Sequence, residues 1–268
     1  MNYKTILIAE EASVRTITLN RPERRNAMTP EMQMELIGAL EVAAESDCRV
    51  LVVTGAGEAF CSGLDLSALQ GIEDKSAIEH RTDAERIAKL LLALYEMPMP
   101  TIAAVHGAAI AGGTGLATIC DFTLATPGAK FGFTEVRIGF VPALVSAFVT
   151  LQIGDKRSRD LLLTGRLFDA AEAYRLGLVN EIVEPEKIAK RVRELADALI
   201  ANSPESLKAT KQLMAAQHRA WLDAAVVKGL EANATSRETA DFREGVAAFL
   251  EKRKPVWGKG TRSMPKNH

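Results

Sequence analysis

The order of apolar segments along this 268-residue chain predicts an α/β fold. Short, continuously apolar runs rich in Val, Ile and Leu are typical of strands that are buried on both faces of a parallel sheet. In the first half these runs alternate with longer segments of helical periodicity, which is the pattern of strand–helix–strand units with right-handed crossovers. Beyond about residue 142 the strand signals become scarce. We therefore expect an α/β core followed by a helical C-terminal region.

The expected strands are short and begin at the N-terminus. Segments 3–9 and 14–19 are rich in Ile, Leu, Val and Thr, and Pro22 follows the second of them. Segment 49–54 reads RVLVVT and ends at Gly55, so it is expected to lie in the middle of a sheet. Further strands are predicted at 101–105, 121–125 and 178–183.

The expected helices carry start and stop signals. Thr29 is a good N-cap and Pro30 suits a first helical turn, so a helix begins there. Its apolar residues at helical spacing are Leu36, Ile37, Leu40, Ala43 and Ala44. A second helix, 77–96, ends before Pro98. The later helical segments are 114–119, 155–163, 169–176, 186–201, 204–219 and 221–250.

Composition narrows the class of protein. Lys and Arg number 33 and Asp and Glu 34, and this balance argues against nucleic-acid and anionic-membrane partners. The cysteines have no C-x-x-C spacing, which argues against a disulfide framework and against a zinc site. No apolar run approaches the roughly 20 residues of a membrane span. The first residues lack the apolar segment of a signal peptide, so a cytoplasmic location without a membrane partner is expected.

Two glycine-rich segments, each following a predicted strand, are the candidate binding loops. They read GAGEAFCSGLD at 55–65 and GAAIAGGTG at 107–115. Neither matches a dinucleotide fingerprint, a phosphate-binding P-loop or a serine-hydrolase elbow. What the loops offer is backbone N–H groups at the carboxyl ends of parallel strands, where open α/β sheets bind ligands. Two converging N–H groups would form an oxyanion hole, and Gly112-Gly113 would place a helix N-terminus beside it.

The joint order of short motifs then resembles the crotonase superfamily, the enoyl-CoA hydratase/isomerase family. The resemblance covers nearly the whole chain. The motifs are RP at 21–22, NA at 26–27, AFCSGLDL at 59–66, IAAVHGAAIAGG at 102–113, CD at 120–121, FGFTEV at 131–136, GFVP at 139–142, LTG at 163–165, AAEA at 170–173, GLV at 177–179 and EKRK at 251–254.

The resemblance implies a crotonase-like spiral of ββα units followed by a helical trimerisation region. We divide the chain accordingly into a spiral core at 1–200 and a helical C-terminal region at 201–268. The family also implies a homotrimer or homohexamer that acts on an acyl-CoA thioester. Coenzyme A then enters as part of the substrate, and the expected enolate chemistry requires no further cofactor and no metal.

The resemblance also implies a set of site residues. The oxyanion hole would be the N–H groups of Leu64 and Gly112. Arg24 and Arg25, just before Ala27, would lie near the nucleotide end of coenzyme A, and Lys252 could reach one of its phosphates. The residues expected to surround the substrate further are Ala27, Ser62, Gly63, Asp65, Leu66, Gly113 and Thr134. Asp65 is also expected to hold its loop by hydrogen bonds.

The acid–base residues depart from the hydratase pattern. Family hydratases hold water between two glutamates; the second is present as Glu135, but the position of the first is Gly115. One glutamate suffices to isomerise a 3-enoyl-CoA to a 2-enoyl-CoA, because a single base can shuttle the proton. Such a base would need a pKa raised toward neutrality by burial. Hydration remains open if Thr114, Thr134 or a second water replaces the missing carboxylate.

A second departure follows Pro142, where segment 143–148 is bulkier than the glycine-rich run of many relatives. We expect it to fill space otherwise used by acyl chain or water. Two further alternatives stay open. One is a methylglutaconyl-CoA-type hydratase, since TEVRIG at 134–139 is similar to that subgroup. The other is a non-catalytic scaffold that binds coenzyme A or RNA on the same fold.

Overall fold

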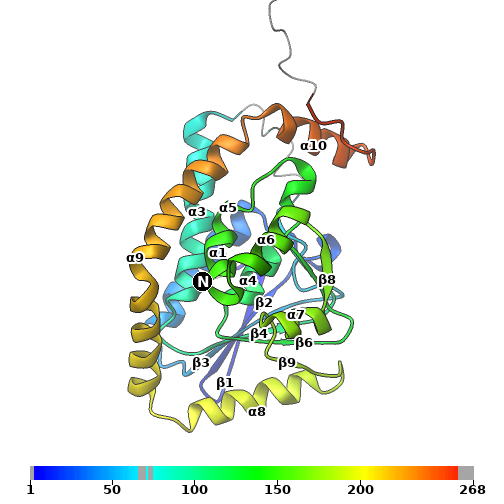
Figure 1. Ribbon diagram of the computed structural model, residues 1–268. Helices are drawn as coiled ribbons and strands as arrows, with labels where there is room; N and C mark the ends of the chain where they lie inside the picture. The colour runs from blue at the N-terminus through cyan, green and yellow to red at the C-terminus, as the bar shows by residue number, and fades with distance from the viewer. Residues whose placement is uncertain (1–2, 66–70, 72–74, 259–268) are drawn as a thin grey trace, which may run out of the picture.

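The computed structural model describes residues 3–65, 71 and 75–258, and within them the strands form two sheets (Figure 1). The larger sheet has the order β1-β2-β3-β4-β6-β9. Its first pair is antiparallel and the remaining pairs are parallel. The bounds are β1 (Ile6–Glu11), β2 (Val14–Leu19), β3 (Val50–Gly55), β4 (Thr101–Val105), β6 (Phe122–Ala125) and β9 (Glu181–Ile182). The predicted α/β class is confirmed.

Helices cover both faces of this sheet, as expected for parallel strands. Residues of α8 (Ile188–Ile200) pack on Val50, Val52 and Ile102 on one face. Leu51 and Val53 point to the other face, whose core includes residues of α1 (Pro30–Ala44), α3 (Ala77–Tyr95) and α4 (Gly112–Ile119). Figure 1 shows α8 alone on its side of the sheet and the other helices opposite. The apolar run of β3 is thus buried on both sides.

Local chemistry sets several boundaries. The Thr29 side chain accepts a hydrogen bond from the Met32 N–H at 3.2 Å, so α1 begins where its cap predicts. The first strand begins later than the predicted residue 3, because the Glu35 carboxylate accepts the N–H groups of Lys4 and Thr5 at 2.7 and 2.8 Å. Those backbone groups are therefore not available to a strand ladder.

The second sheet was not predicted. It consists of β5 (Ala108–Ile110), β7 (Lys130–Gly132) and β8 (Leu167–Asp169). The first of these lies inside the segment 107–115 that we expected to be a continuous loop. Strands of three residues are too short to show a period of two, so the sequence pattern could not reveal them. The predicted strand at 178–183 was too long, since β9 has two residues.

The helices of the C-terminal half differ from the prediction at two places. The segment 143–148 begins a helix that we did not expect, α5 (Ala143–Ile153), preceded by the 3₁₀ helix η3 (Glu135–Ile138). The predicted break near residue 220 is wrong, because α9 (Pro204–Ser236) is continuous and packs along α3 and α5. The chain turns instead at Thr239, which caps α10 (Ala240–Leu250). No proline interrupts residues 215–234, whereas Ser and Thr residues that favour caps lie at 235–239.

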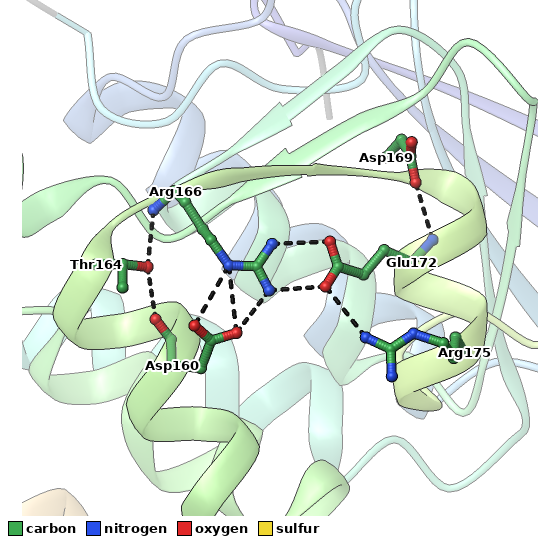
Figure 2. A network of polar contacts seen from close by, with 6 residues as sticks. All are labelled: Asp160, Thr164, Arg166, Asp169, Glu172 and Arg175. Atoms are coloured by element: carbon green, nitrogen blue, oxygen red, sulfur yellow. Dashed lines mark hydrogen bonds and ion pairs between the residues drawn. The ribbon is translucent and has the colours of Figure 1, made fainter.

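A polar network fixes the segment that supports η3 (Figure 2). Arg166 donates to both Glu172 oxygens at 2.7 Å and to Asp160 at 2.6 Å. It thereby joins α6 (Asp155–Thr164) to α7 (Ala170–Leu176) across the start of β8. The neighbouring Gly165 has a φ of +59°, and a Cβ there would lie 2.8 Å from the Val136 side chain of η3. The network holds this close contact in place.

Among the described residues, no helix has the length and apolar character that would let it cross a membrane.

Candidate active site

A cavity of about 220 Å³ lies between the two glycine-rich segments, η3 and the helices α3, α5 and α9. Most of its lining is apolar. Five of the predicted site residues line it together, namely Ser62, Leu64, Gly112, Thr134 and Glu135. Of the lining residues in the described part of the chain, Glu135 is the one with an ionisable side chain. The structure thus brings both predicted oxyanion donors and the predicted base to the lining of one cavity.

The two glycine-rich segments are held against each other by backbone contacts. The Cys61 N–H donates to the Ala108 carbonyl at 3.0 Å, and the Ile110 N–H donates to the Cys61 carbonyl at 2.9 Å. Gly113 lies so close to this crossing that a Cβ on it would be 2.2 Å from the Cys61 carbonyl oxygen. Only glycine fits there. Cys61 is itself fully buried, and burial raises the pKa of its thiol to about 12.

The N–H groups of Leu64 and Gly112 have no acceptor among the described residues. Gly112 is the first residue of α4, whose N-terminal end carries partial positive charge. The preceding Ala111 has a φ of 52° and a ψ of −121°, which is an uncommon conformation for a residue with a Cβ. Its N–H donates to the Gly132 carbonyl at 2.6 Å, a bond that helps to hold this strained turn.

Glu135 is a buried carboxyl group, and within the described part of the chain no cation lies beside it. It is the first residue of η3 and is 9% exposed, and its Oε2 has no hydrogen-bond partner among the described residues. Burial raises the pKa of Glu135 to about 7, because the charged form loses its hydration and no opposite charge compensates. A group with this pKa can take up and release a proton near neutral pH.

Gly115, the position where the resemblance to hydratases would place a glutamate, has no room for a side chain. Gly115 lies on α4, and a Cβ there would be 2.5 Å from Cγ1 of Val145, which belongs to α5 and lines the cavity. Thr114 does not line the cavity. Its hydroxyl donates to the Ala109 carbonyl at 2.6 Å and accepts the Gly132 N–H at 3.1 Å, so it holds β5 to β7. The expectation that bulkier residues after Pro142 fill space beside Glu135 fits this contact.

Asp65 and Asn26 hold the first loop. Arg21 donates to the Asp65 carboxylate at 2.7 Å and also bonds the Ala27 carbonyl. The buried Asn26 side chain donates to the carbonyls of Ala56 and Ala59 at 2.8 and 2.7 Å. These bonds tie segment 21–27 to segment 55–65.

The remaining predicted residues do not line the cavity. Ala27, Gly63, Asp65 and Gly113 are buried in the loop framework around it. Arg24, Arg25 and Lys252 are exposed, and Lys252 lies three residues beyond Phe249, which does line the cavity. Leu66 falls outside the described residues.

Most of the other lining residues are apolar and were not predicted as site residues; among the unpredicted ones are Gln33, Asn233 and Phe249. Gln33 could have been noticed, since it shares the inner face of α1 with Leu36, Ile37 and Leu40 and is a polar residue on an apolar face. Asn233 and Phe249 belong to α9 and α10, and nothing in the local sequence shows that these helices return to the site.

Comparison with known proteins agrees with this geometry. The model of the enoyl-CoA hydratase/isomerase family matches residues 9–260. A Thermus thermophilus protein provisionally named enoyl-CoA hydratase is 43% identical over 92% of this chain and 98% of its own length. Crotonyl-CoA hydratase of Syntrophomonas wolfei is 31% identical over 95% of this chain and 98% of its own length. A solved enoyl-CoA hydratase/isomerase from Xanthobacter autotrophicus is 30% identical with a TM-score of 0.87, over 94% of this chain and 98% of its own.

The fold and site thus define an enzyme of the crotonase superfamily. The chain belongs to the enoyl-CoA hydratase/isomerase family, which acts on acyl-CoA thioesters.

Proposed function

We propose that this enzyme moves the double bond of a 3-enoyl-CoA to the 2-position through a thioester enolate, with Glu135 as its only acid–base group. One observation carries the proposal. The position from which family hydratases project their other glutamate is Gly115, and the Val145 side chain lies where any side chain at Gly115 would begin. The cavity therefore offers one carboxyl group among lining residues that are mostly apolar.

The reaction then needs one proton and one base. The Glu135 carboxylate removes a proton from C2, and the electron pair of that C–H bond moves into the thioester, leaving negative charge on its oxygen. The N–H groups of Leu64 and Gly112 donate to this oxygen. The protonated Glu135 then delivers the same proton to C4, and the C3–C4 double bond shifts to C2–C3. Removal of one oxyanion donor costs about 10²–10³ in rate in enzymes of this type.

Coenzyme A would be held at the cavity mouth. We propose that Arg24 and Arg25 contact its nucleotide end and that Lys252 contacts a phosphate. All three are exposed cations. Ser62 would face the pantetheine, together with the loop that Ala27, Gly63, Asp65 and Gly113 hold in shape. Leu66 is included among the residues proposed to surround coenzyme A only because it ends the AFCSGLDL motif.

Hydration is the second candidate, and two observations favour it. Relatives such as crotonyl-CoA hydratase are named for that reaction. Thr134 lines the cavity next to Glu135 and could orient a water that Glu135 activates. Thr114 is not available for this role, because its hydroxyl is bonded within the framework.

The test uses the purified enzyme with a 3-enoyl-CoA and a 2-enoyl-CoA of medium chain length. Absorbance of the conjugated enoyl thioester should rise with the first substrate and stay constant with the second. Falling absorbance with the 2-enoyl substrate would instead establish hydration. Glu135→Gln should abolish either signal. Turnover that survives this change would show that another group is the base.

A double variant tests directly whether Val145 closes the space beside Gly115. Gly115→Glu alone should leave no room for its carboxylate, because its Cβ would overlap with Val145. Gly115→Glu combined with Val145→Gly should restore the space and gain hydratase activity. Val145→Gly alone is the matched control and should not gain it. If Gly115→Glu alone hydrates a 2-enoyl-CoA, Val145 does not close the position.

We also propose that the enzyme assembles as a homotrimer or homohexamer through its helical C-terminal region. In the single chain, α9 exposes Leu213, Met214, Trp221 and Val227. Such apolar surface is typical of an interface. Light scattering coupled to size exclusion should give three or six times the 29.0 kDa chain mass.

A further inference from the structure

The short helix that carries Glu135 depends on its neighbours for its position. Helix η3 has four residues, and a 3₁₀ helix of about one turn has poorer hydrogen-bond geometry than an α-helix. Its N-cap residue, Thr134, makes no side-chain capping bond. The elements that pack against η3 must therefore set the place of the Glu135 carboxyl group.

Helix α10 packs mainly against η3, and the contact brings backbone against backbone. A Cβ on Gly245, in the middle of α10, would lie 2.3 Å from the carbonyl carbon and oxygen of Ile138 in η3. Gly139, which ends η3 with a φ of +67°, is equally close to α10, since a Cβ there would lie 2.4 Å from the Asp241 carbonyl oxygen. Two glycines thus let the two helices touch without a side chain between them.

A small apolar cluster surrounds this backbone contact. Phe242 and Val246 of α10 are buried and pack with Phe140 and Ile138 in a cluster that is separate from the main core. The ring centres of Phe140 and Phe242 are 5.2 Å apart. Phe140 and Ile138 also line the cavity. Helix α10 therefore supports the part of the cavity lining that follows Glu135 in the chain.

A second close contact limits how far η3 can move. A Cβ on Gly165 would lie 2.8 Å from Cγ2 of Val136, and the neighbouring Arg166 is bonded to α6 and α7 (Figure 2). Helix η3 is thus held near Val136 as well as at Ile138 and Gly139. This leaves little room for the segment to shift as a whole when one of its contacts changes.

A displacement at the end of η3 would reach Glu135 through hydrogen bonds of the backbone. The Phe140 N–H donates to the Glu135 carbonyl at 3.0 Å, and the Gly139 N–H donates to the Val136 carbonyl at 3.3 Å. Ordinary van der Waals contact begins at 3.4 Å, so a Cβ on Gly245 would be about 1 Å too close to Ile138. A misplacement of about 1 Å in an active site can cost about a hundredfold in rate.

We propose that Gly245, Phe242 and Val246 of α10 are positioning residues, which hold η3 so that the Glu135 carboxyl group lies where it can reach C2 of the substrate. The inference rests on the proposed function, in which Glu135 is the base. None of the three residues lines the cavity, so they act only through η3. The C-terminal region then has a role in catalysis within its own chain, in addition to the assembly proposed above.

Gly245→Ala tests this by adding one methyl group where α10 meets Ile138. With a 3-enoyl-CoA at pH 8, kcat should fall about tenfold to a hundredfold while KM changes less than threefold, because the substrate contacts remain and the base is misplaced. Gly38→Ala is the matched control and should leave both constants unchanged, since it makes the same change on α1 where a Cβ meets nothing within 4 Å. A raised KM with unchanged kcat would overturn the proposal, because α10 would then only help to bind the substrate. Unchanged kinetics would overturn it too.

A titration of Glu135 in the free enzyme gives a second result that needs no turnover. Infrared spectroscopy detects the protonated carboxyl group of Glu135, which is assigned by its loss in Glu135→Gln. Burial raises the pKa of Glu135 to about 7 in the wild type. In Gly245→Ala the midpoint should fall by about one pH unit or more toward the ordinary value of 4.5, because a displaced carboxyl group regains water. An unchanged midpoint would show that α10 does not hold Glu135 in place.

Val246→Ala decides the question if Gly245→Ala does not fold. It removes two methyl groups from the cluster with Phe140 and Phe242 and introduces no overlap. The expected changes have the same direction and are smaller, with kcat lowered about threefold to tenfold and KM within threefold. The infrared midpoint should again fall. A loss of stability in urea with unchanged kcat and an unchanged midpoint would make the role of Val246 structural only and would overturn the proposal.

The two proposals fail in different ways. If a 3-enoyl-CoA is isomerised but the α10 variants change neither kcat nor the infrared midpoint, the proposed function stands and α10 does not position the base. If no enoyl substrate reacts with the wild type but the Gly245→Ala midpoint falls, α10 does position Glu135 and the proposed reaction is wrong.

Discussion

Two carboxyl groups of this enzyme, one buried and one partly buried, have opposite surroundings. Glu135 has no cation nearby in the part of the chain that the structure describes, and burial raises its pKa to about 7. Asp83, which pairs with Lys75, Arg86 and Arg237 (the Asp83 cluster), is partly buried, and burial alone would raise its pKa. Hydrogen bonds from Lys75 and Arg86 outweigh that effect and hold the pKa of Asp83 below its ordinary value. Burial by itself therefore does not decide what a carboxyl group does; the presence or absence of cations decides it.

The comparison separates reactivity from structure. A carboxylate neutralised by several cations is a weak base, because protonation would break its ion pairs. A carboxyl group facing apolar side chains has its charged form destabilised, so it is a stronger base and can be protonated at neutral pH. Glu135 suits proton transfer for this reason, and Asp83 suits the anchoring of α3 to Arg237 at the end of α9.

The largest expected effect is that of removing the charge of Asp83. Asp83→Asn leaves three cations around a neutral amide, and we expect a loss of about 3–5 kcal/mol in the free energy of unfolding at pH 7. Urea denaturation measures it. The folded pKa of Asp83 is lowered, so its contribution is present above pH 3.8 and is lost as pH falls through the folded value.

Glu85→Gln is the matched control, because Glu85 lies on the same helix in an exposed pair with Arg81. It should cost less than about 1 kcal/mol. Equal losses in the two variants would mean that the Asp83 cluster behaves like a surface ion pair.

Glu135→Gln should have the opposite effect on stability. The folded pKa of Glu135 is raised from 4.5 to about 7, so the wild-type enzyme loses stability as pH rises between these values. The glutamine variant has no such group. Its stability relative to wild type should therefore increase by about 3 kcal/mol from pH 4.5 to pH 8. Urea denaturation at several pH values gives this difference, and a constant difference would show that Glu135 is not destabilised by its surroundings.

The same pKa sets the pH dependence of the reaction. If the Glu135 carboxylate is the base, kcat/KM should rise about tenfold per unit below its pKa of about 7 and then level off. Between pH 5 and pH 8 the rise should be about a hundredfold. Initial rates with a 3-enoyl-CoA measure it. A profile that levels off already near pH 4.5 would mean that substrate or solvent removes the effect of burial.

Much of the fold could be predicted because its signals are local. The Thr29-Pro30 cap and the apolar run of β3 each determine an element within a few residues. The three-residue strands of the second sheet could not be found this way, because tertiary contacts rather than periodicity create them. The continuity of α9 was missed for a related reason, since nothing but the absence of a breaker distinguishes one long helix from two.

The candidate site shows the same difference between residues predicted from local motifs and contacts that form only in the folded chain. Glu135, Leu64 and Gly112 were predicted through family motifs, and the structure places them in one cavity. The contact between Gly115 and Val145 could not be predicted, because α4 and α5 meet only in the folded chain. Gln33 and Asn233 come from helices about 200 residues apart in the sequence. Their meeting in one cavity depends on the folded arrangement, which no short motif records.

A smaller effect tests the close contact between Gly115 and Val145. A methyl group at Gly115 overlaps with Val145, so Gly115→Ala should cost about 1 kcal/mol or more despite the better helix propensity of alanine. Gly38→Ala on α1 is the control, because a Cβ there meets nothing within 4 Å. That change should stabilise by about 0.5–1 kcal/mol.

A double-mutant cycle with Val145→Ala assigns the cost. If the overlap causes it, Gly115→Ala should be less harmful when Val145 is already alanine. An unchanged cost would place the strain elsewhere in α4.

The smallest expected effect concerns Arg166, whose network is the reverse of the Asp83 cluster. Here one cation is shared by two carboxylates, Asp160 and Glu172, and all three side chains are partly exposed. Water already solvates these charges, so Arg166→Met should cost about 1 kcal/mol or less, and added salt should reduce the difference. Urea denaturation at low and high ionic strength measures both. A loss as large as that of Asp83→Asn would mean that the number of shared partners matters more than burial. The contrast between Glu135 and Asp83 would then rest on charge pairing alone.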